Sequence, residues 1–206
     1  MQLISYPSRD AAVAGVAARL AGALAVRLAH GPAGLALPGG TTPAPVMAAL
    51  AGVPLDWARV TVLPGDERLV APDHPRSNYG LIRRHLLQGP AASARLLPLT
   101  ERTEPPPPTA TLLGMGEDGH VASLFPGAPG LAAALAPDAP PVVAMRAPDG
   151  EARLSLSAPV LRASGLLVIF ITGAAKRAVI EVASGADPLQ APVAAFLDRA
   201  EVHWAE

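Results

Sequence analysis

Apolar residues along the chain fall into two repeating patterns. Short continuous apolar runs are typical of buried strands, and longer segments place apolar residues three or four apart, as in an amphipathic helix. The pattern predicts strands over Gln2–Tyr6, Gly34–Leu37, Val60–Leu63, Thr109–Leu113, Leu166–Ile171 and Glu201–Trp204. It predicts helices over Ala11–Ala29, Ala44–Leu50 and Tyr79–Leu87, and a fourth that starts near Lys176 and ends at about Ala183.

This alternation of strands and helices predicts an α/β fold, a Rossmann-like, mostly parallel sheet with helices on both faces. We expect a single domain over residues 1–206, because too little chain flanks the Pro105–Pro108 run for it to link two cores. Ser8 or Asp10 is the expected cap of the first helix. Thr42 is the expected cap of the second, with Pro43 at its first position.

Four of the predicted strands are followed by loops rich in glycine or polar residues. In open α/β sheets, ligands bind outside the carboxyl ends of the strands. We therefore expect these loops to converge on one site; they are Gly39–Thr42, Gly65–Arg68, Gly114–His120 and Thr172–Lys176.

The first and last of these loops suit an anion. Two glycines and two threonines at a helix start can cradle a phosphate with backbone N–H groups and hydroxyls, although a plain capped turn has the same composition. Lys176 is the only lysine of the chain and lies in the first turn of a predicted helix. A cation there opposes the helix dipole, which an anionic ligand would offset; the alternative is an exposed surface lysine.

The two middle loops carry candidate acid–base chemistry. Alternation along Asp66-Glu67-Arg68 should point Asp66 and Arg68 the same way, although a surface ion-pair cluster is the alternative. His120 directly follows a glycine loop at a strand end, where a histidine can act as a general base near neutral pH. The alternative for His120 is a hydrogen bond that holds the loop.

Composition excludes several classes of function. A net charge of −1 and only two Trp, two Tyr and three Phe predict no nucleic-acid partner. The absence of Cys excludes disulfides and a Cys nucleophile, and the scattered histidines predict no metal site. The longest apolar run, Leu166–Ile171, is too short to span a membrane and no signal peptide is evident, so we expect a cytoplasmic protein without a membrane partner.

Gly114–Gly119 matches the dinucleotide-binding pattern G-x-G-x-x-G, but its context does not. It lies in the middle of the chain, and Pro126 limits any following helix to about two turns. We therefore expect no dinucleotide cofactor here.

Taken together, several motifs in order along the chain resemble the 6-phosphogluconolactonase family, within the wider glucosamine-6-phosphate isomerase/deaminase superfamily. They cover nearly the whole sequence, and the stretch LLGMGEDGHVASLFP is the most specific. The matching segments are Leu37–Pro43, Gly65–Val70, Ser77–Tyr79, Leu112–Pro126, Arg153–Leu161, Gly173–Lys176 and His203–Trp204.

The resemblance implies hydrolysis of 6-phospho-D-glucono-1,5-lactone to 6-phosphogluconate, in the oxidative pentose phosphate pathway, without a metal or organic cofactor. The phosphate would be held by Gly39, Gly40, Thr41, Thr42 and Lys176. Arg68 would contact the substrate from the phosphate side or the lactone side, and His120 would activate water. Asp118 and Asp66 would line the reacting end.

The family usually has a helix between Leu99 and Thr109, and four consecutive prolines cannot form one here. Either a peripheral element has been lost or the sequence omits residues. Whether Arg153 reaches the substrate or only starts a strand stays open, and the chain is expected to be a monomer or small homo-oligomer.

Two other functions are compatible with this scaffold. A glucosamine-6-phosphate isomerase/deaminase would share the phosphate loop, but Arg68 after Asp-Glu favours the lactonase. A non-catalytic sugar-phosphate sensor would need residues for a DNA-binding helix-turn-helix, which this sequence does not offer.

Overall fold

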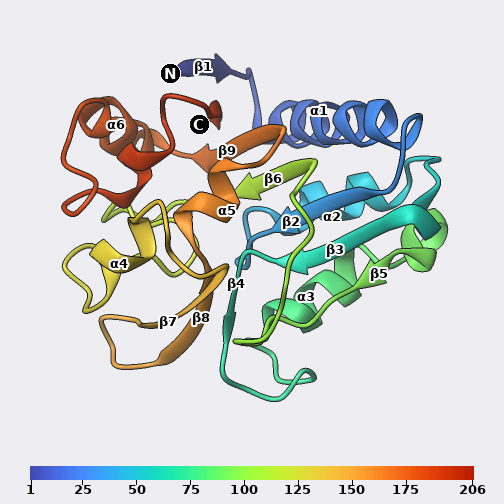
Figure 1. Cartoon of the computed structure of the whole chain (residues 1–206). Helices are drawn as coiled ribbons and strands as arrows, with labels where there is room; N and C mark the ends of the chain where they lie inside the picture. The colour runs from blue at the N-terminus through green and yellow to red at the C-terminus, as the bar shows by residue number, and fades with distance from the viewer.

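The computed structural model describes residues 1–206 and is built around a seven-stranded sheet (Figure 1). Its strands lie in the order β1-β10-β9-β6-β2-β3-β5, and every neighbouring pair is parallel. In this spatial order they are β1 (Gln2–Ser5), β10 (Glu201–Ala205), β9 (Leu166–Thr172), β6 (Ala110–Leu113), β2 (Ala33–Leu37), β3 (Val60–Pro64) and β5 (Arg95–Leu96).

A second sheet of three antiparallel strands lies beside the first, in the order β4-β8-β7. The strands are β4 (Asp66–Arg68), β7 (Val142–Arg146) and β8 (Ala152–Leu156). Only Gly65 separates β3 from β4, so the chain passes from the main sheet directly into the small one. The small sheet therefore stands at the carboxyl end of β3.

Helices cover both faces of the main sheet. The α-helices are α1 (Arg9–Leu28), α2 (Ala44–Ala51), α3 (Asn78–His85), α4 (Leu131–Leu135), α5 (Ala158–Arg162) and α6 (Ala174–Ala183). Three short 3₁₀ helices complete the set: η1 (Trp57–Arg59), η2 (Gly89–Ser93) and η3 (Pro192–Ala195).

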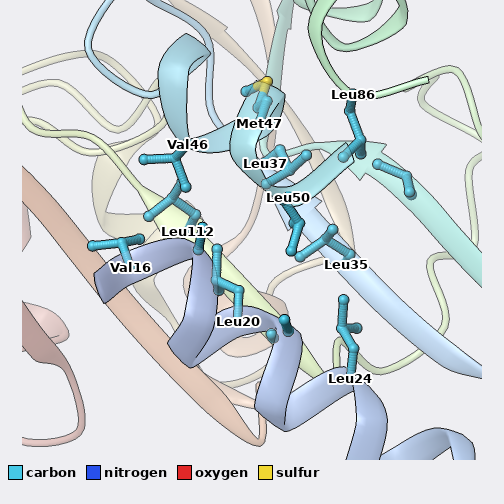
Figure 2. Close-up of a cluster of buried hydrophobic side chains, with 14 of the residues drawn as sticks. Val16, Leu20, Leu24, Leu35, Leu37, Val46, Met47, Leu50, Leu86 and Leu112 are labelled. Carbon is cyan, nitrogen blue, oxygen red and sulfur yellow. The ribbon is translucent and has the colours of Figure 1, made fainter. Parts of the chain in front are cut away.

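The main sheet separates two hydrophobic clusters, and successive side chains of β9 point alternately into one and the other. Leu166, Val168 and Phe170 belong to the cluster on the side of α1, α2 and α3. Leu167, Ile169 and Ile171 belong to the cluster on the side of α5, α6 and the small sheet. Figure 2 shows the first cluster, where leucines of α1 and α2 pack onto β2 and β6. Both faces being buried explains why these strands are apolar without interruption.

Every strand and helix predicted from the sequence is present, with bounds that differ by no more than two residues. The predicted fold class, a mostly parallel sheet with helices on both faces, is confirmed. The sequence pattern does not predict the antiparallel sheet, because β4 is three residues long and β7 and β8 follow a stretch rich in Pro and Gly. Ser8 caps α1, accepting a hydrogen bond from the Ala11 N–H at 3.1 Å.

α1 is long and apolar enough to cross a membrane by length and composition alone. In the structure its apolar stripe packs on the sheet instead, and the helix contacts β2, β9 and β10. The buried residues of this stripe are Ala12, Val16, Ala17, Leu20, Ala21, Leu24 and Leu28.

His203 is the buried histidine of β10 and links three elements. Its Nδ1 lies 2.8 Å from the Tyr6 hydroxyl, and its Nε2 lies 3.5 Å from a carboxylate oxygen of Glu201, which in turn binds Arg19 of α1. Burial lowers the pKa of His203, while Glu201 raises it to a smaller extent. The folded protein therefore favours the neutral form of this imidazole.

Acid should weaken the fold through His203. In the unfolded chain it titrates near its ordinary pKa of about 6.5, so the unfolded state takes up the proton first as the pH falls. We expect the free energy of unfolding, measured with urea, to decrease between pH 7.5 and pH 5.5. His203→Gln should flatten this decrease; an unchanged pH dependence in the variant would refute the role of His203.

Candidate active site

The four loops predicted to converge do line one cavity of about 300 Å³. The strands that precede them are neighbours in the order β9-β6-β2-β3. The chain runs outward from β2 to β3 and β5, and in the other direction from β6 to β9 and β10, so the sheet order reverses between β2 and β6. Such a reversal leaves a crevice at the carboxyl ends of the strands, which is where the cavity lies.

The Gly39–Thr42 loop after β2 leaves its backbone donors free. None of its four amides donates a hydrogen bond within the protein, and all four residues line the cavity. Gly40 has φ +98°, and a Cβ on Gly39 would clash with the Asn78 amide, so both positions need glycine. The loop therefore offers unpaired N–H groups and two hydroxyls to an anion.

The prediction that Thr42 caps α2 is wrong. Pro43 occupies the cap position, and no side chain makes a capping hydrogen bond. With Thr42 as the cap, the third helical residue would be Pro45, which has no N–H to donate to the Thr42 hydroxyl. The Thr42 hydroxyl is consequently not used by the helix.

Lys176 lies in the first turn of α6 and its side chain lines the cavity. Gly173 is the N-cap residue of this helix, and its φ of +86° turns the chain from β9 into the helix. The turn brings the only lysine of the chain to the same cavity as the Gly39–Thr42 loop.

His120 and Asp118 form a hydrogen-bonded pair at the end of the glycine loop. The His120 Nδ1 lies 2.6 Å from Asp118 Oδ1, which also accepts the His120 backbone N–H at 3.1 Å. A Cβ on Gly116 would overlap the His120 ring and the Asp118 carboxylate, so the tight turn requires glycine there. His120 lines the cavity, whereas Asp118, which was also expected to line it, is not among the lining residues. With Asp118 accepting from Nδ1–H, the Nε2 lone pair is available to take a proton.

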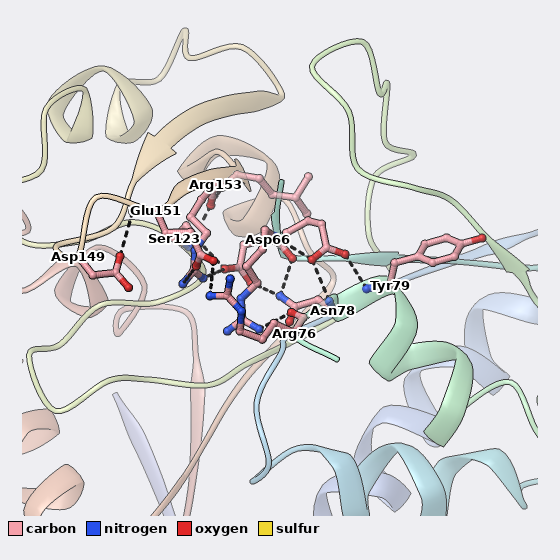
Figure 3. Close-up of polar contacts among 12 residues, drawn as sticks. Asp66, Arg76, Asn78, Tyr79, Ser123, Asp149, Glu151 and Arg153 are labelled. Atoms are coloured by element: carbon pink, nitrogen blue, oxygen red, sulfur yellow. Dashed lines mark hydrogen bonds and ion pairs between the residues drawn. The ribbon is translucent and has the colours of Figure 1, made fainter. Parts of the chain in front are cut away.

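Asp66 is a buried carboxylate that faces the cavity, and Figure 3 shows the donors around it. The Ser123 hydroxyl donates to Oδ2 at 2.5 Å, and the Asn78 amide donates to Oδ1 at 3.1 Å. A guanidinium nitrogen of Arg153 lies 3.8 Å from Oδ2. Burial raises the pKa of Asp66, and the Ser123 hydrogen bond and the nearby arginines oppose that rise.

Glu67 points away from the cavity and holds the start of α3. Its Oε1 accepts the backbone N–H groups of Arg68 and Asn78, both at 2.8 Å. Its Oε2 accepts the Tyr79 N–H at 2.7 Å and the Ser77 hydroxyl at 3.1 Å. Four donors on one carboxylate fix both ends of the polar loop between β4 and α3. The expected alternation, with Asp66 and Arg68 on one side and Glu67 on the other, is confirmed.

Arg153 lies on β8 and lines the cavity, so it both belongs to a strand and reaches the site. It stands directly opposite Arg68 in the β4–β8 pair. Like charges in this position repel each other, and the carboxylates of Asp66 and Glu151, the latter 2.6 Å from Arg153, offset that repulsion. With Lys176, the cavity has three cationic side chains against the one carboxylate of Asp66.

The sequence predicts most of the residues that line the cavity. It does not predict that Asn78, Ser123 and Glu67 hold the lining residues in place. Asn78 and Ser123 are visible only within matching motifs, as neighbours of Tyr79 and His120. Their contacts with Asp66 join residues that are distant in the sequence, and no local sequence pattern predicts such contacts.

The Gly114–Gly119 stretch forms a turn and no helix starts from it, since α4 begins only at Leu131. A dinucleotide fingerprint needs a helix N-terminus directly after the glycines. No group of three or more His, Asp or Glu side chains is placed to hold a metal ion.

Comparison with known protein families places the chain in a class of sugar-phosphate enzymes. A family model described as glucosamine-6-phosphate isomerases/6-phosphogluconolactonase matches residues 7–111 and 94–204. The protein belongs to this family, which confirms the resemblance inferred from its motifs.

Similar proteins within the family carry the name 6-phosphogluconolactonase. The protein of that name from Caulobacter vibrioides is 41% identical over 230 positions, covering 100% of this chain and 98% of its own. The one from Pseudomonas putida is 39% identical over 208 positions, covering 92% and 85%. A crystal structure of a 6-phosphogluconolactonase from Shewanella baltica superposes with a TM-score of 0.94 at 28% identity, covering 100% and 98%.

The Caulobacter relative contains positions that have no counterpart in this chain. The Caulobacter alignment needs 230 positions to span a chain of 206 residues, so it contains positions without a counterpart here. The two matches to the family model overlap at residues 94–111, the region where the resemblance implies either a lost helix or omitted residues. Residues 104–107 have no regular secondary structure, as the prolines require.

Proposed function

We propose that the protein hydrolyses 6-phospho-D-glucono-1,5-lactone to 6-phosphogluconate in the cytoplasmic oxidative pentose phosphate pathway. The observation that carries the proposal is that two chemically different sets of groups line one cavity. One set is the unpaired amides of Gly39–Thr42 together with Lys176, and the other is His120, which is hydrogen-bonded to Asp118. Relatives named for this reaction match nearly the whole chain.

The phosphate end supplies binding energy remote from the reacting carbonyl. Backbone N–H groups and hydroxyls of Gly39, Gly40, Thr41 and Thr42 surround the phosphate oxygens, and Lys176 adds a full positive charge. Holding the phosphate there orients the lactone ring toward His120.

The reacting end activates water. His120 Nε2 takes a proton from a water molecule as its oxygen bonds to the lactone carbonyl carbon, while Asp118 keeps Nδ1 protonated and stabilises the imidazolium. The carbon–ring oxygen bond then breaks and the imidazolium returns the proton to the leaving ring oxygen. The product is a hydroxy acid that ionises to the carboxylate.

We assign Arg68 to the lactone side of the site. It lies two residues from Asp66 and directly opposite Arg153, and Ser123 connects Asp66 to the loop of His120. A guanidinium there stabilises the negative charge that develops on the carbonyl oxygen. The mechanism uses no metal, so the rate should be the same with and without the chelator EDTA.

The assay generates the lactone in situ with glucose-6-phosphate dehydrogenase and follows the product with 6-phosphogluconate dehydrogenase. The wild-type protein should consume the lactone much faster than it opens spontaneously. A rate no higher than spontaneous opening would overturn the proposal, and release of ammonia from glucosamine 6-phosphate would then be measured to test the deaminase alternative.

Replacing Lys176 with alanine should act mainly on binding. Losing one charge-assisted contact to phosphate should raise KM by roughly 10- to 100-fold, with a much smaller change in kcat. Arg199→Ala is the matched control, because that side chain is exposed and does not line the cavity. An unchanged KM in the Lys176 variant would show that the phosphate lies elsewhere.

A further inference from the structure

Trp204 anchors the turn from which Lys176 projects. It lies on β10, next to β9, with Ile171 as its register partner. Its indole Nε1–H donates to the carbonyl of Gly173 at 3.0 Å. The Gly173 N–H in turn donates to the carbonyl of Ala205 at 2.9 Å. Both polar groups of the residue that starts α6 are thus bonded to the last strand.

The Gly173 carbonyl also accepts a backbone hydrogen bond from the first turn of α6. The Arg177 N–H donates to it at 3.3 Å, so the indole N–H and a first-turn helix N–H meet on the same oxygen. The Arg177 guanidinium lies 4.6 Å from the Trp204 ring centroid and bonds to Glu181 at 2.9 Å. Arg177 therefore stacks outside the cavity while its neighbour Lys176 lines it.

We propose that Trp204 is a positioning residue for Lys176, acting through Gly173. A lysine in the first turn opposes the helix dipole, and the Gly173 cap makes no side-chain hydrogen bond, so the helix start has little stabilisation of its own. Trp204 supplies it from the neighbouring strand. Trp204 does not line the cavity, so its effect on the ligand passes through the turn.

This role rests on the proposed function of Lys176 as a phosphate ligand, and a matched pair of variants tests it. Trp204→Phe keeps an aromatic ring beside Arg177 and removes the indole N–H together with one ring of the indole. Trp57→Phe makes the same change at the other tryptophan, whose Nε1–H donates to the Val53 carbonyl at 2.9 Å and which does not line the cavity.

We expect Trp204→Phe to raise KM for the lactone roughly three- to tenfold, the loss that one hydrogen bond gives, with kcat changed less than about twofold. Trp57→Phe should leave KM unchanged. The Lys176→Ala/Trp204→Phe double variant should have the KM of Lys176→Ala alone, because the two residues act on one contact. Equal KM values for the two tryptophan variants, or additive effects in the double variant, would overturn the inference.

A binding measurement separates this inference from the proposed activity. Calorimetric titration with 6-phosphogluconate should show weaker affinity in Trp204→Phe than in Trp57→Phe. If the wild type fails to hydrolyse the lactone yet this difference appears, the activity is wrong and the positioning role stands. If hydrolysis is fast and the two variants bind 6-phosphogluconate equally, the positioning role is wrong and the activity stands.

Discussion

Replacing His120 with alanine should lower kcat about 10²- to 10⁴-fold, the usual contribution of a general base. The structure gives the reason: His120 faces the cavity with Nε2 free, and Asp118 holds Nδ1 at 2.6 Å. KM should change little, because the proposed phosphate contacts lie on other loops. The coupled lactone assay measures both constants against the spontaneous rate.

Two further variants show whether the loss of activity is specific to His120. His30→Ala removes an exposed histidine that does not line the cavity, and its activity should equal that of the wild type. Asp118→Asn should lower kcat by less than His120→Ala, because the imidazole stays but loses its oriented partner. Full activity in His120→Ala, alongside an active wild type, would show that another group activates the water.

Replacing Glu67 with alanine should give the largest loss of stability. Four donors would lose their acceptor at a buried position: the N–H groups of Arg68, Asn78 and Tyr79 and the Ser77 hydroxyl. Unsatisfied buried donors cost about 1–3 kcal/mol each, and partial access of water would reduce the sum to roughly 3–5 kcal/mol. Urea denaturation measures the change directly.

The same variant should also lose activity at temperatures where it remains folded. Glu67 fixes the start of α3, and Asn78 at that start donates to both the Asp66 carboxylate and the Asp66 backbone carbonyl. Glu104→Ala is the control, since Glu104 is exposed and does not line the cavity, and its stability should match the wild type. A Glu67 variant as stable as the Glu104 variant would contradict the role assigned to this carboxylate.

Much of the site follows from local patterns. Strand-length apolar runs followed by unusual loops are enough to locate Gly39–Thr42, Asp66, His120 and Lys176, all of which line the cavity. The prediction succeeds because parallel strands expose their carboxyl ends at one edge of a sheet, so loops that follow neighbouring strands must meet there.

The errors and omissions have a different origin. The sequence predicts Thr42 as the cap of α2, but Pro43 takes the cap position, and Pro45 lacks one of the N–H groups that a Thr42 cap could bind. The small antiparallel sheet places Arg153 opposite Arg68, although the two residues lie far apart along the chain. Nothing in either segment by itself indicates the pairing, because short strands are specified by their partners as much as by their own residues.

By itself the sequence determined the α/β architecture, because apolar periodicity is a local property that follows directly from which faces must be buried. It also indicated the loops that line the cavity. Only the tertiary structure decided which groups support these loops. Ser123 and Asn78 donate hydrogen bonds to Asp66, and Glu67 accepts a hydrogen bond at the start of α3. Trp204 donates a hydrogen bond to the carbonyl of Gly173. These contacts join residues far apart in the chain, so they exist only once the strands have taken their order in the sheet.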